Sequence, residues 1–546
     1  MIDAMLNSDM TFDALKDSPD GRVCHDVVEY IRFKACADLD FNGAAIKPDD
    51  LFEVFRVKPL TYDMTVLNML REQQSRTGTK EGCAEGDCGA CSVVVVDFDL
   101  HGRLQWKAIN SCIYLVGQLD GKALMTIEDL PYLNLGIKKH NQKTLHPLQE
   151  AMIQHHGSQC GFCTPGIIMS MAALYHQDGA FSTQSIERQL AGNLCRCTGY
   201  RPIVKAASVA FKQNEQSKHS PKLVNALETQ LLKLSDKIKS KRYLYVRNDL
   251  QKIDDDQKDL NQDVSFFVAP TTLDQLLSFY HQHKDAVLLS GGSDVGLWIT
   301  KQLRDLKKII WLGHVKELRR IEEDHQCLTI WAGATYQDCE KQLTALHDDL
   351  GSLICRIGGA QIRACASLCA NIANGSPIGD MPPALLALET TIYLRSINGG
   401  RLIPLEDFFI EYGKQNIKPG EIVEKITIEK LKSNQFYRVW KISKRFDQDI
   451  STLTGGFCFT IDQSRHISAV KIVFGGMAGI PKRAKLCEQI LQYAHIDDQH
   501  VFEKALSALD KDFTPIDDAR ASRWYRAAIC KNLLRKCFTE MTSHAK

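Results

Sequence analysis

The sequence predicts a multidomain α+β protein, and three observations support this class. Its 546 residues suggest roughly three to five domains. Eight cysteines fall in tight groups between residues 31 and 210, which sets a cysteine-rich region apart from the rest of the chain. From Phe266 onward, apolar strands alternate with amphipathic helices and Gly-rich turns, and helices are expected near residues 520–540.

Composition and charge narrow the functional classes. Hydrophobic residues make up 44% of the chain and charged residues 24%, as in ordinary soluble globular proteins. The formal net charge is +1, so neither a nucleic acid nor an anionic membrane surface is an expected partner. No apolar run reaches the roughly 18 residues of a membrane span, and the N-terminus lacks the pattern of a secretory signal. Nineteen cysteines without such a signal indicate a reducing compartment, and we expect a cytoplasmic protein.

The first cysteine group lies in the stretch KEGCAEGDCGAC. Cys83, Cys88 and Cys91 have the spacing C-x4-C-x2-C, which with a distant fourth cysteine is the plant-type pattern for a [2Fe–2S] cluster. Cys112 is the nearest later cysteine and the expected fourth ligand. Glycines between the ligands and just before the first one let the backbone curl around a cluster and point its N–H groups at the sulfurs. These glycines are Gly82, Gly86 and Gly89. A structural zinc site is the alternative, although paired C-x2-C units are more usual there.

The second cysteine group combines a C-x2-C pair, Cys160 and Cys163, with a C-x-C pair, Cys195 and Cys197. Each pair precedes a helical pattern, and Thr164 is the expected N-cap of the first helix. Thiolates at helix N-termini meet the positive end of the helix dipole, which favours the deprotonated, metal-binding form. The four thiolates therefore predict a second complete site, again with zinc as the alternative.

These motifs together resemble the iron–sulfur part of the xanthine dehydrogenase family of molybdenum hydroxylases. The stretches that carry the resemblance are KEGCAEGDCGAC, NSC, QCGFCTPG and GNLCRCTGYRPI. The resemblance extends beyond the cysteines and covers about residues 60–210 and 265–540. Segments similar to the family's flavin-binding and C-terminal flavoprotein motifs are residues 288–295, 371–380, 440–450, 474–484 and 518–522.

The resemblance implies a fold for each region. The expected order is a plant-type ferredoxin β-grasp domain, an all-α four-helix [2Fe–2S] domain, an α+β FAD-binding domain and an α+β C-terminal flavoprotein domain. Their expected bounds are 31–130, 131–211, 263–432 and 433–546. Residues 1–30 are an acidic leader of unknown role, and the polar, lysine-rich residues 212–262 are a predicted linker. Neither the leader nor the insertion-like residues 35–51 are explained by the resemblance.

The resemblance also implies two [2Fe–2S] clusters, FAD, and NAD+ as co-substrate. The expected FAD pyrophosphate loop consists of Leu288, Leu289, Ser290, Gly291, Gly292, Ser293, Asp294 and Val295. The same correspondence places Ser367, Asn371 and Asp380 at the phosphate and ribitol side of the flavin. It places Lys441 near the flavin ring. Gln159 matches a family glutamine that contacts molybdopterin on a partner subunit, and a solvated loop glutamine is the alternative.

The function implied by the resemblance is electron transfer, as in the small subunit of the family's bacterial members. Electrons would pass from a partner's molybdenum centre through the Cys160 group, then the Cys83 group, to FAD and NAD+. The net reaction would oxidise hypoxanthine or xanthine to urate. The expected partner is a large molybdopterin-binding subunit, in a heterotetramer of two small and two large subunits. The alternatives are another heterocycle or an aldehyde as substrate, oxygen as acceptor, or a non-catalytic zinc-binding assembly protein.

Three residues depart from the family pattern around the flavin. Cys369 and Ala370 occupy paired-glycine positions, where a positive φ would make each replacement cost about 1 kcal/mol. Ile357 stands where many relatives have an aromatic ring beside the flavin. We therefore expect FAD, bound more weakly or with altered access for its oxidant, and a flavin-free domain is the alternative. A redox-active pair of Cys365 and Cys369 is a further alternative.

Overall fold

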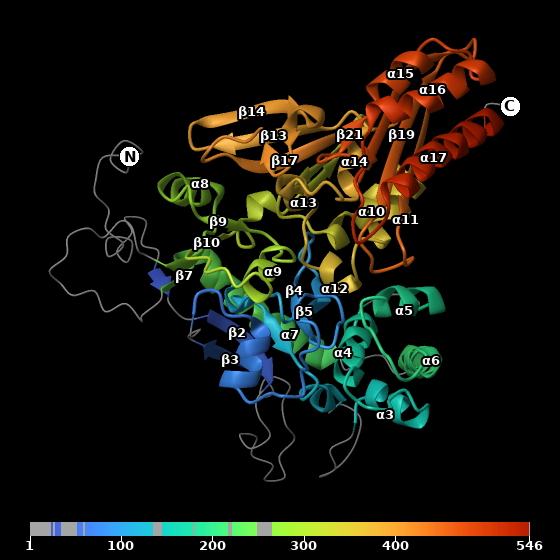
Figure 1. The fold of residues 1–546 in the computed structure, drawn as a ribbon. Coiled ribbons are helices and arrows are strands. Elements are labelled where there is room, and N and C mark those ends of the chain that lie inside the picture. Colours follow the sequence, from blue (N-terminus) through green and yellow to red (C-terminus); the bar gives the residue numbers. More distant parts are fainter. Residues whose placement is uncertain are drawn as a thin grey trace, which may run out of the picture. The chain divides into compact units, whose positions relative to one another are not determined.

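The computed structural model describes residues 23–25, 28–33, 52–57, 61–134, 145–177, 181–216, 221–247 and 265–544. These residues form two compact units (Figure 1). The first unit contains the described residues up to Lys316 together with Ala360–Ile362. The second contains Glu317–Gly359 and the described residues from Arg363 onward. Within the described part of the chain, none of the helices combines the length and apolar character needed to cross a bilayer.

One sheet of the first unit is five-stranded and mixed, in the order β3-β2-β6-β4-β5. Its strands are β2 (Val28–Phe33), β3 (Phe52–Val57), β4 (Ser92–Phe98), β5 (Leu104–Asn110) and β6 (Ala123–Met125). Strand β4 reads SVVVVDF and is buried on both faces, as expected for a central strand of β-branched residues. A short helix, α2 (Val66–Asn68), continues into a π-helical turn over Met69–Gln73.

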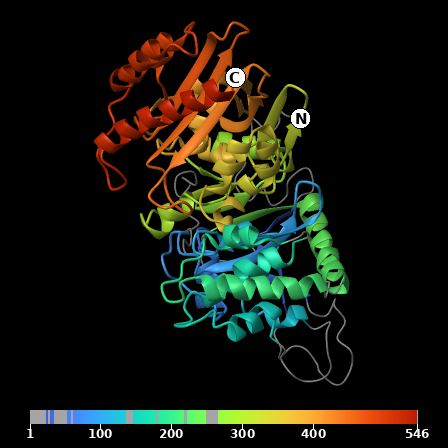
Figure 2. The same cartoon turned by 90° about the vertical axis from the view of Figure 1, so that its right-hand side faces the viewer.

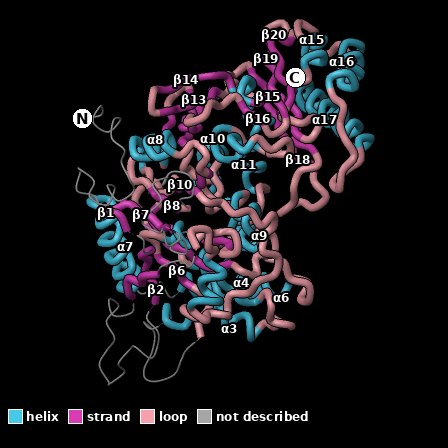
Figure 3. The backbone as a smooth tube through the Cα atoms, turned by 60° about the vertical axis from the view of Figure 1, so that its left-hand side comes forward, coloured by secondary structure: helices cyan, strands magenta, loops and turns pink. Residues whose placement is uncertain are grey.

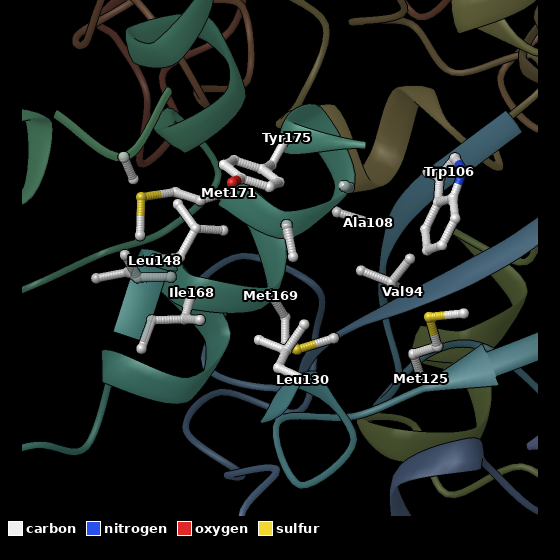
Figure 4. Close-up of a cluster of buried hydrophobic side chains, with 14 of the residues drawn as sticks. Val94, Trp106, Ala108, Met125, Leu130, Leu148, Ile168, Met169, Met171 and Tyr175 are labelled. Carbon is white, nitrogen blue, oxygen red and sulfur yellow. The ribbon is translucent and has the colours of Figure 1, made fainter. Parts of the chain in front are cut away.

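Four helices follow the first sheet (Figure 1). They are α3 (Pro147–Gln154), α4 (Thr164–Tyr175), α5 (Thr183–Leu190) and α6 (Arg201–Gln216). Helix α4 is apolar along most of its length and contacts both β4 and β5. Figure 4 shows Ile168, Met169 and Tyr175 of this helix in the same buried cluster as Val94 and Trp106 of the sheet. The core therefore joins the sheet to the four helices.

A second sheet of the first unit has the order β1-β7-β8-β10-β9. Its strands are β1 (Val23–His25), β7 (Arg242–Arg247), β8 (Phe266–Ala269), β9 (Val287–Leu289) and β10 (Lys308–Trp311). Strands β8, β10 and β9 run parallel, whereas β7 is antiparallel to β8 and parallel to β1. Figure 3 shows β1, β7, β8 and β10 close together. The connections carry helices α8 (Leu273–Gln282) and α9 (Val295–Thr300). The expected phosphate loop therefore follows the short strand β9 at the edge of this sheet.

The predicted linker, residues 212–262, contains the long helix α7 (Pro221–Lys241) and strand β7. Its polar composition hides a narrow apolar stripe at helical spacing. The buried members of this stripe are Ala226, Leu227, Leu231 and Leu234, and they belong to the main core of the first unit. Strand β1 and the first residues of β2 lie within the predicted leader, 1–30. The insertion-like residues 35–51 lie outside the described residues.

The first half of the second unit is built on an antiparallel sheet in the order β11-β12-β17-β13-β14. Its strands are β11 (Ile321–Glu323), β12 (Cys327–Trp331), β13 (Thr391–Ser396), β14 (Gly399–Pro404) and β17 (Ile422–Glu429). The helices are α10 (Tyr336–Leu346), α11 (Asp348–Cys355), α13 (Leu368–Asn374) and α14 (Met381–Leu386), and a small hairpin pairs β15 (Phe409–Glu411) with β16 (Lys414–Gln415). Helix α13 contacts β17, which places the expected flavin-binding segment on this sheet.

The second half of the second unit is a four-stranded antiparallel sheet with helices. The strands are β18 (Gln435–Ile442), β19 (Leu453–Ile461), β20 (Ile467–Gly475) and β21 (Lys482–Arg483), and the helices are α15 (Lys485–Leu491), α16 (Gln499–Asp512) and α17 (Arg523–His544). Helix α17 lies along β18 and β19 (Figure 2). Neighbouring residues of β19 face opposite sides, because a Cβ at Gly455 would meet Phe457 and one at Gly456 would meet Pro383 of α14. The α+β multidomain class predicted from the sequence is confirmed.

Candidate iron–sulfur and flavin sites

The first cysteine group is assembled by the loop before β4 and the turn after β5. Cys83 accepts side-chain hydrogen bonds from Cys112 and Cys88, which hold its pKa well below the ordinary thiol value and raise the pKa of both donors. A hydrogen bond from Cys112 likewise lowers the pKa of Cys91. The backbone N–H groups of Glu85 and Cys88 point at the Cys83 sulfur, at 3.4 and 3.3 Å. Side-chain hydrogen bonds therefore link all four predicted thiols into one group.

Glycine is required by the geometry of this loop. A Cβ atom added at Gly82 would lie 2.8 Å from the Cys88 sulfur. Gly86 and Gly89 have φ values of +77° and +69°, in the left-handed region that favours glycine. The space and the inward N–H groups fit an anionic iron–sulfur cluster.

The second cysteine group is assembled by the loop before α4 and the loop before α6. Burial raises the pKa of Cys163 to about 12, and a hydrogen bond to Cys195 adds to this rise. A hydrogen bond with Cys160 raises the pKa of Cys197. Helix α4 begins at Thr164 with Cys163 as its N-cap, one residue earlier than the sequence predicted. The predicted four thiols again lie together, and Gln159 is exposed in the loop just before Cys160.

The chemistry of these two donor sets fits clusters of two irons. Among the described residues, no three His, Cys, Asp or Glu side chains converge in the way that ligands of a single metal ion do. A [2Fe–2S] cluster does not need that convergence, because its four thiolates are shared between two irons. When bound, such clusters take up and release single electrons.

The two cysteine groups approach each other through their backbones. The N–H of Leu194, which precedes Cys195, donates to the carbonyl oxygen of Cys88 at 2.9 Å. A Cβ added at Gly166 of α4 would lie 2.2 Å from the Gly89 carbonyl oxygen. The segments that carry the two ligand sets are therefore in direct contact within the first unit.

The predicted phosphate loop, residues 288–295, also lies in the first unit. It joins β9 to α9 and turns at Gly292, whose φ is +85°. The Ser290 carbonyl oxygen accepts hydrogen bonds from the Trp311 indole at 3.1 Å and from the Gln118 amide at 3.3 Å. Gln118 lies at the end of the segment that carries Cys112, so the first cysteine group and this loop are neighbours. Neither Trp311 nor Gln118 was singled out from the sequence, since no motif marks a contact between two distant segments.

The remaining predicted flavin residues lie in the second unit. The Lys441 ammonium donates to Asp380 Oδ2 at 2.7 Å, and both side chains are buried, with 2% and 9% exposed. Asp380 Oδ1 also accepts hydrogen bonds from Ser451 and Thr454. Lys441 donates in addition to the Arg356 carbonyl oxygen at 3.0 Å. The structure thus pairs Asp380 with Lys441 and adds partners that the sequence analysis missed.

Ser367 and Asn371 lie at the start and middle of α13. Ser367 is the N-cap, and its hydroxyl accepts from the Ala370 N–H at 3.3 Å. Asn371 Oδ1 is buried and has no hydrogen-bond partner among the described residues. A Cβ added at Gly379 would lie 3.3 Å from this oxygen. An unsatisfied buried acceptor facing a glycine fits a site that receives a donor from a bound cofactor.

The departures at the paired-glycine positions do not strain the backbone. Cys369 and Ala370 are both within helix α13, and neither has a positive φ. The Cys369 thiol is fully buried and lies 3.6 Å from the Ile330 carbonyl oxygen, and burial raises its pKa to about 12. The expected cost of about 1 kcal/mol per residue therefore does not arise, because both residues adopt ordinary helical conformations. Neither Cys365 nor Cys369 is in a disulfide.

Three protein-family models match separate parts of this chain. A [2Fe-2S] binding domain matches residues 135–208, and an FAD binding domain in molybdopterin dehydrogenase matches residues 261–430. A CO dehydrogenase flavoprotein C-terminal domain matches residues 438–541. These matches include the second cysteine group, the phosphate loop, helix α13 and Lys441. The predicted four-helix iron–sulfur domain and the two flavoprotein domains are confirmed as domain types.

Curated relatives are similar over most of this chain. Xanthine dehydrogenase of Emericella nidulans is 31% identical over 489 residues, covering 83% of this chain and 35% of the relative. Xanthine dehydrogenase of Oryza sativa subsp. japonica is 29% identical over 534 residues, covering 88% of this chain and 38% of the relative. The chain therefore spans little more than a third of the length of these relatives.

Solved structures show a partial likeness. Carbon monoxide dehydrogenase from Hydrogenophaga pseudoflava gives a TM-score of 0.47 at 21% identity, covering 50% of this chain and 94% of that chain. Quinoline 2-oxidoreductase from Pseudomonas putida 86 gives a TM-score of 0.47 at 18% identity, covering 51% of this chain and 96% of that chain.

The domain matches and the site define a class. The chain is a molybdenum hydroxylase family protein that carries iron–sulfur and FAD domains.

Proposed function

We propose that this chain is the iron–sulfur and FAD subunit of a xanthine dehydrogenase. It would transfer electrons from a separate molybdopterin subunit to NAD+ while hypoxanthine or xanthine is oxidised to urate. The observation that carries the electron-transfer role is the backbone hydrogen bond from the Leu194 N–H to the Cys88 carbonyl, which joins the segments that carry the two groups of four thiols. The names of the similar relatives support the choice of substrate.

The first cysteine group would hold one [2Fe–2S] cluster, and the second group would hold another. The ligands of the first are Cys83, Cys88, Cys91 and Cys112, and those of the second are Cys160, Cys163, Cys195 and Cys197. Inward N–H groups around Cys83 stabilise negative charge on the sulfurs, and burial of Cys91 and Cys112 keeps water from that side. Cys160 and Cys197 are exposed, so the second group would face the partner that delivers electrons.

Flavin binding would use a glycine turn and two polar side chains. The backbone turn at Gly292 would accept the pyrophosphate, since glycine lets the chain approach phosphate closely. Asn371 Oδ1 would accept a hydrogen bond from the cofactor, and the buried Lys441 would place a positive charge at its site. Two oxygen acceptors contact the Lys441 ammonium, which leaves one of its three donors for the cofactor. When bound, FAD would supply two-electron chemistry: once reduced by two electrons and protonated from water, it could donate a hydride to NAD+.

The proposed partner is a large molybdopterin-binding subunit in a heterotetramer of two small and two large subunits. Gln159 is exposed next to Cys160 and would reach the pterin across that boundary. The proposed compartment is the cytoplasm, because free thiols and iron–sulfur clusters need reducing conditions.

The first test is an absorption spectrum of the purified chain with assays of iron, sulfide, zinc and acid-released flavin. We expect about four iron, four sulfide and one FAD per polypeptide. Zinc in place of iron would support the assembly-protein alternative, and iron without flavin would remove the NAD+ step. The isolated chain should also reduce ferricyanide with NADH, which tests the flavin without the partner. Substrate choice is decided by co-expression with the molybdenum subunit and assays with xanthine, quinoline and an aldehyde.

A further inference from the structure

Gln361 is a fully buried amide that neither the motifs nor the proposed function account for. It belongs to Ala360–Ile362, the three residues of α12 (Ala360–Arg363) that cluster with the first unit. Its side chain is 0% exposed. Gln361 Nε2 lies within hydrogen-bond distance of three buried oxygens. These are Ser92 Oγ at 3.1 Å, Ser170 Oγ at 2.9 Å and Asn193 Oδ1 at 2.9 Å.

Each of these partners lies close to a cluster ligand. Ser92 directly follows Cys91, and Asn193 lies two residues before Cys195. Ser170 is on helix α4, whose N-cap is Cys163. One amide group therefore contacts the segment of the first cysteine group and both segments of the second.

Two of these partners also contact the carbonyl oxygen of Gly89, which lies between Cys88 and Cys91. This oxygen accepts from Ser92 Oγ at 2.8 Å and from Asn193 Nδ2 at 3.0 Å. Because the Ser92 hydroxyl donates to Gly89, its oxygen is available to accept from Gln361. The result is a buried polar network that runs from Gln361 to the ligand loop of the first group.

Backbone atoms pack closely around Gly89, next to this polar network. A Cβ added at Gly89 would lie 2.2 Å from the Gly192 carbonyl oxygen, and one at Gly166 would lie 2.2 Å from the Gly89 oxygen. Buried polar groups are costly unless their hydrogen bonds are made, so removal of the amide leaves buried oxygens without donors. The segments would then separate or admit water.

We propose that Gln361 is a positioning residue that holds the Cys88–Cys91 loop against the Gly192–Cys195 loop. It thereby preserves the hydrogen bond from the Leu194 N–H to the Cys88 carbonyl, which links the two ligand sets. One consequence of this inference rests on the proposed function, namely that this link sets the coupling between the two clusters. The positioning role itself concerns this chain's own residues.

The test replaces Gln361 by methionine, which keeps the length of the side chain and removes the donors. The matched control is Gln189→Met, because the Gln189 amide also donates to Ser170, at its carbonyl oxygen, and makes no hydrogen bond with the described residues of either cysteine loop. Ser170→Ala is a milder variant that removes one acceptor, and it serves if Gln361→Met does not fold. All variants are made in the full chain.

The first readout is hydrogen exchange of the peptide that contains Leu194, measured by mass spectrometry. Exchange in Gln361→Met should be at least about tenfold faster than in the wild type, with Gln189→Met unchanged and Ser170→Ala between them. Equal protection in all four proteins would overturn the positioning role. This readout does not depend on which metal is bound.

The second readout is the magnetic interaction between the reduced clusters, measured by electron paramagnetic resonance. Gln361→Met should keep the wild-type iron content and show a weaker interaction, whereas Gln189→Met should match the wild type. An unchanged interaction at full iron content would overturn the consequence for coupling and leave the proposed function standing. Zinc in the wild type would instead refute the proposed function, and the exchange measurement would still decide the role of Gln361.

Discussion

The two units hold their candidate sites by different physical means. In the first unit, the cysteine loops meet through glycine backbones, at Gly89 and Gly166, with neutral hydrogen bonds around them. In the second unit, the site is organised by a buried charge pair, Asp380 and Lys441. The first arrangement is sensitive to added volume, and the second is sensitive to removed charge. Substitutions chosen for one kind of contact should therefore have little effect in the other unit.

Loss of one thiolate should have the largest effect, and only the cysteine group that contains this thiolate should lose its iron. Cys88→Ser and Cys160→Ser should each remove about half of the iron, because serine is a poor ligand for iron–sulfur clusters. Iron analysis and electron paramagnetic resonance would show which cluster remains. Cys458→Ser is the control, since this thiol belongs to neither group. Loss of all iron in either single variant would mean that the two groups do not assemble independently.

Removing one partner of the buried charge pair should be the next largest effect. Lys441→Met leaves the Asp380 carboxylate buried without its cation, and such changes typically cost about 3–5 kcal/mol. We expect a lower temperature for the thermal transition of the second unit and reduced flavin content, with the iron content unchanged. The control is Lys444→Met, which removes a lysine from the exposed stretch nearby. Equal flavin content in both variants would show that the pair does not support the flavin site.

Added side-chain volume should lower the free energy of unfolding of the first unit by a smaller amount. Gly166→Ala places a Cβ against the Gly89 carbonyl and should cost about 1–3 kcal/mol, as overpacking usually does. The control is Gly102→Ala, because nothing lies within 4 Å of a Cβ at Gly102. It is better suited than Gly157→Ala for this reason. Gly102 has a φ of +78°, so its replacement measures backbone strain alone, about 1 kcal/mol. Denaturant unfolding compares the two, and a smaller cost at Gly166 would contradict the close contact.

The smallest expected effect concerns pH and a charge pair in the second unit. Burial raises the pKa of Asp518, but hydrogen bonds from Arg526 and from backbone amides outweigh it and lower the pKa to about 2. Since the folded-state pKa is below the ordinary value, the stabilisation is present above about pH 4 and is lost as the pH falls towards 2. Asp518→Asn should reduce stability by about 0.2–1 kcal/mol at neutral pH, since Asp518 is partly exposed.

The measurement is the difference in unfolding free energy between Asp518→Asn and the wild type across this pH range. The difference should shrink as the pH falls from 4 to 2. The corresponding difference for Gly166→Ala should not change with pH, because that contact contains no titrating group. If the differences in unfolding free energy of the two variants changed with pH in the same way, the contrast between the units would be refuted.

Much of the candidate site could be predicted because its ligands follow one another closely along the chain. Cysteine spacing alone brought Cys83, Cys88 and Cys91 together, since short loops limit how far apart their sulfurs can lie. The helix after Cys163 was placed within one residue from a Thr-Pro signal. The helix α7 was missed as a packed element, because four apolar residues at helical spacing are hard to see among many lysines.

Residues that act across long sequence separations could not be predicted. Gln361 and Asn193 are 168 positions apart, and Asp380 and Thr454 are 74 apart. No local pattern marks a glutamine that will be buried among three hydroxyl and amide oxygens. The expected strain at Cys369 was likewise a matter of backbone conformation, which turned out to be helical.

The amino-acid sequence by itself determined the multidomain α+β class and the two sets of cysteines, because ligand spacing and hydrophobic periodicity are local properties of a chain. Only the tertiary structure decided how the two sets of cysteines meet, which carboxylate pairs with Lys441, and where the buried Gln361 amide donates. The reason is physical: these contacts depend on packing between segments that are distant in sequence, and a buried polar group finds its partner only once the surrounding core has formed.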